Sequence, residues 1–242
     1  MVGFIGSGNM ATALARGLGE PVLCTDNGSG RAQRLVDELG GEVVSNAECA
    51  ERADILVLAH KPYQLDTVAS GIDARRIVVS ILGDTSVEQV RRAHPNARSV
   101  LRLEPNTPTE LRRGVLIFAE SDSPDAPAVH ERFATLGTVV ELPDRLVGIA
   151  GAVSGVGPAY WALLAEAWTD AAVRHGIPAD KAATLVTETM AGTAALLAHT
   201  DTLAARRAVT SPGGATARGL NALEQGGVRA ALANAMDAVV NP

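Results

Sequence analysis

The sequence is poor in cysteine, in lysine and in positive charge. Its only two cysteines, Cys24 and Cys49, have no CxxC spacing and no histidine at ligand spacing, so we expect neither a disulfide framework nor a metal site. The formal net charge of -6 disfavours nucleic acids and membrane surfaces as partners, because both select a basic face. No uninterrupted apolar run reaches the ~18 residues of a membrane span, and no basic segment precedes the first apolar residues. We therefore expect a cytoplasmic globular protein.

Short β-branched runs alternate with helical stretches over the first part of the chain, which is typical of a doubly wound parallel sheet. We therefore predict that residues 1–146 form an α/β Rossmann-type domain. The expected strands are Val2–Ile5, Val22–Thr25, Ile55–Leu58, Ile77–Ile81 and Val115–Ala119, with Val139–Leu142 as a further candidate. The expected helices between them are Met10–Leu18, Arg31–Leu39 and Val87–Arg92.

Beyond Pro143 the sequence becomes rich in alanine, leucine and threonine, and we predict an all-helical domain over residues 147–242. The expected helices are Pro158–His175, Ala179–Leu197, Thr216–Glu224 and Val228–Val239. Small and apolar residues occupy more than one face of these helices, so they must be buried. A domain this short makes a thin core, and we infer a homodimer in which helices of one subunit pack on the other. The alternative is a helical domain that folds only against its own α/β half.

The segment Gly6-Ser7-Gly8-Asn9-Met10-Ala11 has the spacing of a dinucleotide-binding turn. It stands where that turn belongs, between a first strand and an amphipathic helix. Gly6 permits the tight turn, Gly8 lets the backbone approach a pyrophosphate, and Ala11 lets the helix pack closely on the strand. The phosphates would bind at the helix N-terminus. The alternative is a tight turn without a ligand.

Asp26 follows the second expected strand, about 20 residues after the first glycines, where an acidic residue can bind the ribose 2'-hydroxyl of NAD. This position favours NADH as the cofactor. Ser29, Arg31 and Arg34 follow closely and could instead bind the 2'-phosphate of NADPH. Asp26 could also serve only as a helix cap.

Lys61 and Pro62 follow the expected strand Ile55–Leu58, at the sheet edge where open parallel sheets bind ligands. Lys61 is one of only two lysines in the chain, and its alternative role is that of a solvated surface residue. His60 lies at the same strand end and could approach a nicotinamide, although a lone histidine is more often structural.

A glycine-rich segment, Ser211-Pro212-Gly213-Gly214-Ala215-Thr216, interrupts the helical part of the chain. Two glycines free the backbone, and the helix that follows offers N–H groups to an anion such as a carboxylate. Ser211 and Thr216 add hydroxyl groups. A capped helix N-terminus with Thr216 as the N-cap is the plainer and compatible interpretation. We expect a cofactor site and a substrate site, far apart in the sequence, that must meet.

This chain resembles the pyrroline-5-carboxylate reductases of proline biosynthesis. The resemblance spans essentially the whole chain, and its most specific part is the Ser-Pro-Gly-Gly-x-Thr segment. The matching blocks, in order, are Phe4–Ala11, Pro105–Pro108, Ser154–Tyr160, Ser211–Thr216 and Leu220–Gly227. The resemblance implies a Rossmann domain, an interlocking helical dimer domain, and hydride transfer from NAD(P)H to the C=N carbon of 1-pyrroline-5-carboxylate, a small cyclic imino acid.

The resemblance also implies roles for individual residues. The substrate carboxylate would be held by the backbone of Gly213, Gly214, Ala215 and Thr216, with the Thr216 hydroxyl near the ring nitrogen. Further matches are Val209 and Ser211 in the substrate pocket, Asn46 near the adenosine, Ala59, Lys61 and Pro62 at the strand-end cofactor contact, and Asn106 and Thr107 beside the nicotinamide. A protonated imine is already electrophilic, so positioning and exclusion of water can carry much of the catalysis.

The sequence departs from the family pattern at His60, at Glu104 before the Asn-Thr-Pro block, and at Val156. These departures keep a reductase of another cyclic imino acid open as an alternative, together with a non-catalytic dinucleotide-binding module. A β-hydroxyacid dehydrogenase is disfavoured, because Ser154–Trp168 lacks the lysine that its chemistry needs.

Overall fold

The structure, a computed structural model, describes residues 1–241, and the chain divides after Pro158 into two compact units. The expected boundary after residue 146 falls inside helix α7 (Asp144–Ser154), which contacts β6 and β7 of the sheet in the first unit.

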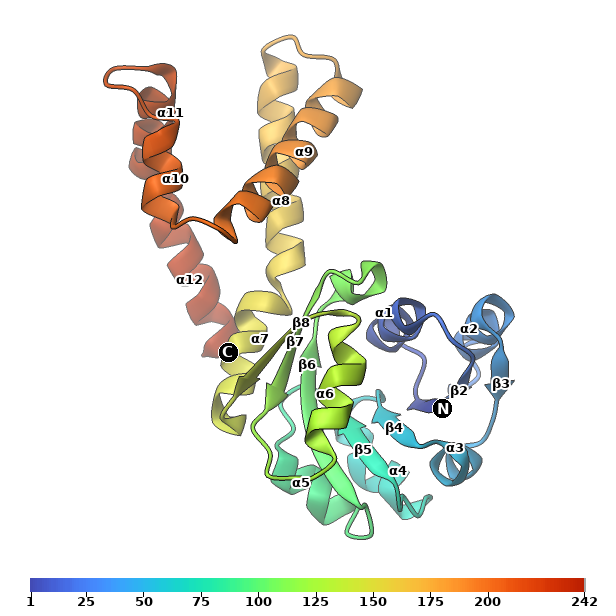
Figure 1. Ribbon diagram of the computed structural model, residues 1–242. Helices are drawn as coiled ribbons and strands as arrows, with labels where there is room; N and C mark the ends of the chain where they lie inside the picture. The colour runs from blue at the N-terminus through green and yellow to red at the C-terminus, as the bar shows by residue number, and fades with distance from the viewer. Residues whose placement is uncertain (242) are drawn as a thin grey trace. The chain divides into compact units, whose positions relative to one another are not determined.

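The first unit is built on one eight-stranded sheet in the order β3-β2-β1-β4-β5-β6-β7-β8 (Figure 1). Its strands are β1 Val2–Ile5, β2 Val22–Thr25, β3 Gly41–Val43, β4 Ile55–Leu58, β5 Ile77–Ser80, β6 Ser99–Pro105, β7 Gly114–Ala119 and β8 Gly137–Leu142. The α/β Rossmann-type fold with a mostly parallel sheet is confirmed, and the one antiparallel pair within the described residues is β6 with β7. The chain between Pro105 and Gly114 is too short for the crossover that a parallel pair requires.

Helices cover both faces of this sheet. One face packs against α1, α2 and α6 through a core that includes Phe4, Leu14 and Phe133. The other face packs against α3, α4 and α5 through residues such as Leu56 and Val90, and α7 extends this layer over β7. The helices are α1 Asn9–Leu18, α2 Arg31–Leu39, α3 Asn46–Arg52, α4 Leu65–Ser70, α5 Val87–Ala93 and α6 Ala126–Ala134, with short 3-10 turns at Pro62–Gln64 and Thr107–Leu111.

The two cysteines lie in different layers of the first unit. Cys24 is buried in the layer of α1, α2 and α6, and Cys49 in the layer of α3, α4 and α5. Burial raises the pKa of the Cys49 thiol to about 12, and burial also raises the pKa of Cys24. Both thiols therefore stay protonated at neutral pH.

The second unit is helical and leaves much apolar surface uncovered. Its helices are α8 Gly157–Arg174, which begins in the first unit, α9 Ala179–Leu197, α10 Thr202–Ala208, α11 Ala215–Gln225 and α12 Val228–Val240. Trp161, Leu163 and Trp168 on α8 are each more than half exposed. Contacts among these helices are sparse, so this unit does not bury its own apolar faces.

One stretch, Asp144–Arg174, is long and apolar enough to span a membrane by length and composition, because an 18-residue window within it has a mean hydropathy of 1.4. The sequence prediction concerned uninterrupted apolar runs, and none in this stretch reaches 18 residues. Isolated polar residues and glycines interrupt every apolar run in this stretch, but mean hydropathy averages over them. Core helices of soluble proteins meet the same criterion, so one such stretch is weak evidence for a membrane span.

Candidate functional site

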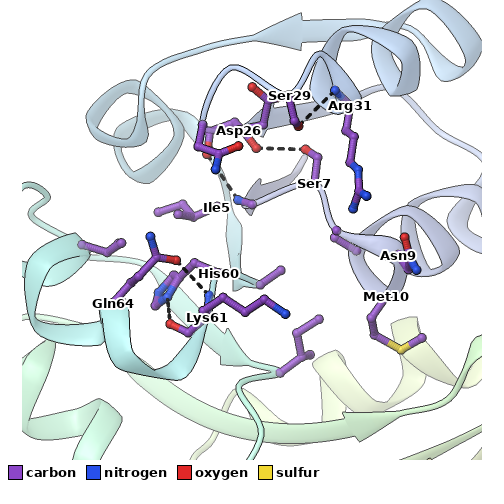
Figure 2. Close-up of a pocket in the computed structure, with 18 of the residues that line it drawn as sticks. Ile5, Ser7, Asn9, Met10, Asp26, Ser29, Arg31, His60, Lys61 and Gln64 are labelled. Carbon is purple, nitrogen blue, oxygen red and sulfur yellow. Dashed lines mark hydrogen bonds between the residues drawn. The ribbon is translucent and has the colours of Figure 1, made fainter.

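A pocket of about 720 Å³ lies at the carboxyl edge of the sheet, over the ends of β1, β2, β4 and β5 (Figure 2). Ten of the residues predicted from the sequence to bind a cofactor line it: Gly6, Ser7, Gly8, Asn9, Met10, Asp26, Asn46, Ala59, Lys61 and Pro62. Asn106 and Thr107 do not line it. The carboxyl edge is where open α/β sheets bind their ligands, so the sequence motifs and the pocket coincide.

The glycine turn after β1 shapes one wall of the pocket. Gly6 has a φ of 101°, and a Cβ there would stand 2.8 Å from the carbonyl oxygen of Ala59, so only glycine fits. The Gly6 amide donates to Oγ1 of Thr25 (3.2 Å), and the Ser7 hydroxyl donates to the Thr25 carbonyl oxygen (2.9 Å). A Cβ on Gly8 would meet no atom within 4 Å. Gly8 therefore faces open space into which a ligand can come close to the backbone.

The N-terminus of α1 opens directly on this turn. Gly8 is the N-cap, it gives no side-chain cap, and no acidic residue stands in the first turn. The first N–H groups of the helix therefore keep their partial positive charge for a ligand. Asn9 and Met10 line the pocket from this turn (Figure 2). This geometry suits a pyrophosphate.

At the other end of the pocket, Asp26 holds its own loop. Its Oδ1 accepts a hydrogen bond from the Gly28 amide (2.8 Å), and its Oδ2 accepts from the Ser29 hydroxyl (3.1 Å) and the Ala32 amide (3.0 Å). These hydrogen bonds lower the pKa of Asp26, and the bond from the Ala32 amide has the largest effect. Asp26 therefore accepts an N–H group in the first turn of α2, close to the capping role of the alternative interpretation, although the N-cap of the helix is Gly30. Arg31 lines the pocket and extends its side chain into it (Figure 2).

The segment after β4 forms the opposite wall. The Lys61 amide donates to Oε1 of Gln64 (3.1 Å), and Nδ1 of His60 lies 2.9 Å from the Lys61 carbonyl oxygen (Figure 2). A carbonyl only accepts, so Nδ1 carries the hydrogen. Burial lowers the pKa of His60, which keeps the ring neutral at neutral pH. Lys61 is an exposed lining residue that makes no ion pair within residues 1–241.

The side chain of Asn106 is buried and links α7 to β7 through two hydrogen bonds. Its Nδ2 donates to the Ser154 carbonyl oxygen (3.0 Å) at the end of α7, and its Oδ1 accepts from the Val115 amide (2.8 Å) on β7. The side-chain amide is thereby used inside the first unit. Thr107 follows it as the first residue of a 3-10 turn.

In the second unit, the segment Ser211–Thr216 is a tight turn that leads into α11. The helix begins at Ala215 with Gly214 as its N-cap, so the prediction of Thr216 as the N-cap is wrong. The turn requires glycine at position 214, because a Cβ there would collide with Ser211. The cap gives no side-chain hydrogen bond, and the first turn has no acidic residue. The first N–H groups of α11 therefore have no side-chain acceptor.

Two side chains at these sites were not identified from the sequence. Gln64 braces the Lys61 backbone, and its spacing three residues after Lys61 is that of a capping pair. Arg218 donates from Nη1 to the Gly213 carbonyl oxygen (2.8 Å) and so fixes the backbone of the Ser211–Thr216 segment. No sequence pattern distinguishes this arginine from the other exposed arginines.

Comparison with known proteins covers both parts of the chain. Residues 144–242 match the family model of pyrroline-5-carboxylate reductase dimerisation, and residues 1–83 match that of the coenzyme F420-dependent NADP oxidoreductases. The pyrroline-5-carboxylate reductase 3 of Macaca fascicularis is 32% identical over 259 residues, which cover 98% of this chain and 92% of that protein. The pyrroline-5-carboxylate reductase of Synechocystis sp. is 37% identical over 201 residues, which cover 80% of this chain and 75% of that protein.

A solved structure agrees with these relatives. The crystal structure of Plasmodium falciparum pyrroline carboxylate reductase with NADP bound matches with a TM-score of 0.87 at 28% identity, covering 98% of this chain and 94% of that one. The agreement in sequence and in fold extends from the glycine turn after β1 to the last helix. The chain therefore belongs to the pyrroline-5-carboxylate reductase family.

Proposed function

We propose that this protein uses NADPH or NADH to reduce the C=N bond of 1-pyrroline-5-carboxylate, giving L-proline, and so serves proline biosynthesis. The observation that carries this proposal is the 32% identity to a pyrroline-5-carboxylate reductase over 98% of this chain and 92% of that protein, together with the Ser211–Thr216 segment on which the sequence resemblance rests. Two free, buried cysteines are in keeping with a reducing cytoplasm.

Several residues of the pocket would hold the dinucleotide. The N–H groups at the start of α1 would bind the pyrophosphate, and Lys61 would add a positive charge on the opposite wall. When bound, the reduced nicotinamide supplies a hydride. We place its ring toward the β5 end of the pocket, near Ile81 and Gly83, because the Asp26 loop at the β2 end suits the adenosine. The two hydrogen bonds of the Asn106 side chain would keep the neighbouring end of β6 in place.

The cofactor preference is a separate point. The NADH preference inferred from Asp26 is not confirmed, because the Asp26 carboxylate already accepts three hydrogen bonds from its own loop. Arg31, with Ser29 beside it, offers the pocket a positive charge and a hydroxyl. These contacts support NADPH as the preferred cofactor, since a 2'-phosphate would meet the guanidinium.

The substrate would be held by the loop before α11. Backbone amides of Gly214, Ala215 and Thr216 would bind the ring carboxylate, with the Gly213 carbonyl fixed by Arg218. Val209 would line the ring pocket, and Ser211 and Thr216 would place hydroxyl groups near the reacting bond. The free N–H groups of Ala215 and Thr216 at the start of α11 support this assignment, whereas the Gly214 amide donates to the Ser211 carbonyl oxygen (3.0 Å) in this structure.

The family model for residues 144–242 is that of a dimerisation domain, which supports a homodimer. We propose that residues 147–242 form this domain, residues 1–146 the dinucleotide-binding one, and that the exposed apolar face around Trp161 and Trp168 on α8 is buried against the second subunit.

Loss of reduced-cofactor absorbance tests the function, with 1-pyrroline-5-carboxylate and its six-membered homologue offered to the purified dimer. Fast turnover of the five-membered ring is the expected result. Preference for the six-membered ring would favour the alternative reductase, and Glu104 and Val156 are the departures that keep it open. Cofactor binding without turnover of either imine would indicate a non-catalytic module.

A further inference from the structure

Glu104 stands at the sheet edge beside the cofactor pocket, on the strand next to its β5 end. Residues Ile81 and Gly83, which follow β5, line the pocket. Ser80 on β5 pairs in parallel with Arg102 on β6, so Glu104 lies two residues further along β6, level with that lining segment. Glu104 does not itself line the pocket, but if the nicotinamide lies at the β5 end, Glu104 stands on the next strand outward, at the level where the substrate would bind beyond the ring.

Helix α7 leaves room for this side chain. Gly148, Gly151 and Gly155 follow one another at helical spacing. They face the charged side chains of Arg102 and Glu104 on β6. A Cβ on Gly151 would stand 3.1 Å from Cγ of Glu104, and one on Gly155 would stand 3.6 Å from its Oε1. Larger residues at these positions would displace the carboxyl group. The glycines of α7 thus make space for a carboxyl group in a partly buried place.

The Glu104 carboxyl has no protein partner. Within the described chain it takes part in no hydrogen bond and no ion pair. The neighbouring cation, Arg102, is committed to Asp144 on α7, where Nη1 lies 3.0 Å from Oδ1. Asp84, from the loop after β5, is the other charged group that acts on Glu104, and β7 contributes no titratable side chain.

These surroundings favour the protonated acid. Burial raises the pKa of Glu104, the charge of Asp84 raises it further, and the charge of Arg102 opposes both. A carboxyl group that keeps its proton closer to neutral pH can act as a general acid. A hydroxyl such as that of Thr216 can orient a nitrogen but is too weak an acid to protonate it.

We propose that Glu104 donates the proton that the imine nitrogen gains on reduction, a proposal that rests on the function proposed above. The step applies to the imine that binds in its neutral form: as the hydride reaches the ring carbon, the C=N π pair takes the carboxyl proton to form the N–H bond. The Glu104 O–H bond breaks, and the carboxylate regains a proton from water. Hydride and proton together account for the two hydrogens that the substrate gains.

The test compares Glu104→Gln with the wild type and with Glu131→Gln, a matched change at an exposed position on α6. Wild-type kcat should fall about tenfold per pH unit above the pKa of Glu104, because only the protonated acid is active. E104Q should lower kcat by roughly 10²- to 10⁴-fold and remove this alkaline limb, while E131Q keeps the wild-type profile. An E104Q enzyme with wild-type kcat and the same limb overturns the proposal.

A binding measurement separates this inference from the proposed function. In the presence of oxidised cofactor, the enzyme is titrated with L-proline and with tetrahydrofuran-2-carboxylate, which has a neutral ring oxygen in place of the charged amine. If Glu104 faces the ring nitrogen, E104Q should weaken L-proline binding by about tenfold or more and leave the oxygen analogue unaffected. Equal effects on both ligands, or none on either, overturn the proposal, even in a protein that turns over neither imine.

Discussion

The amide of Ala32 donates a 3.0 Å hydrogen bond to Oδ2 of Asp26, across the loop that joins β2 to α2. The acidic residue that usually indicates a ribose contact is thereby turned toward its own helix. The loop is held rigid, and Arg31 is the side chain left to extend into the pocket.

Replacing Asp26 should destabilise the protein before it affects the cofactor preference. Asp26→Ala removes a cap of α2 and should cost about 1 kcal/mol in the free energy of unfolding, measured by urea denaturation. Asp122→Ala, at an exposed loop position with no hydrogen bond within residues 1–241, is the control and should be neutral. Equal stability of the two variants would contradict the capping role.

The same carboxylate predicts a pH dependence of stability. Because the pKa of Asp26 is lowered in the folded state, its stabilisation is present above the unfolded value of about 3.9 and is lost as the pH falls through the folded pKa. The difference in unfolding free energy between wild type and Asp26→Ala should therefore shrink below about pH 4. A difference that stays constant to lower pH would show that the charge of Asp26 contributes nothing.

Arg31→Ala should raise KM for NADPH by about tenfold, the loss expected for a charge-assisted contact. KM for NADH should change little, because NADH has no 2'-phosphate. Arg34→Ala is the matched control, since Arg34 lies one turn further along α2 and does not line the pocket. Steady-state kinetics with both cofactors measure the result, and an equal rise for both would rule out the 2'-phosphate contact.

Two alanine substitutions in the glycine turn should separate folding from binding. Gly8→Ala puts its Cβ into open space, so thermal stability should be kept while cofactor affinity falls roughly tenfold or more. Gly6→Ala strains a φ of 101° and presses on Ala59, so it should cost about 1–3 kcal/mol of stability. Calorimetry and cofactor titration measure both effects, and full cofactor affinity in Gly8→Ala would place the pyrophosphate elsewhere.

Trp161→Glu should convert the dimer to a monomer. Trp161 is 61% exposed in the single chain, and a buried charge without a partner is costly at an interface. Ala128→Glu, on the exposed side of α6, should leave the dimer intact. Sedimentation at several protein concentrations distinguishes them, and a dimeric Trp161→Glu protein would move the interface away from this part of α8.

The elements that the sequence predicts well are those with a strong hydrophobic signal. Buried strands such as Val22–Thr25 and Ile55–Leu58 appear at the expected residues. Strand β3 was missed because all three of its residues are exposed, so no apolar pattern indicates a strand there. Strand β6 was missed because Arg102 and Glu104 interrupt its apolar run.

The cofactor pocket was predictable because its residues follow strand ends along one edge. The sequence could not decide which contacts Asp26 makes, since an acidic residue that binds a ribose and one that caps a helix occur in the same local pattern. The surroundings of Glu104 were not predictable at all. They depend on the glycines of α7, some fifty residues later in the chain, and on an arginine already paired to Asp144.

The burial of Cys24 and Cys49 in opposite layers makes the two thiols independent reporters of local opening. A thiol reagent can reach each one only when its own layer separates from the sheet, because neither is exposed in the folded chain. The rate at which each cysteine is labelled then measures how often that layer opens. If a bound dinucleotide joins the two layers into one cooperative unit, it should slow the labelling of both cysteines. If the two layers open independently, it should slow the labelling of only one cysteine.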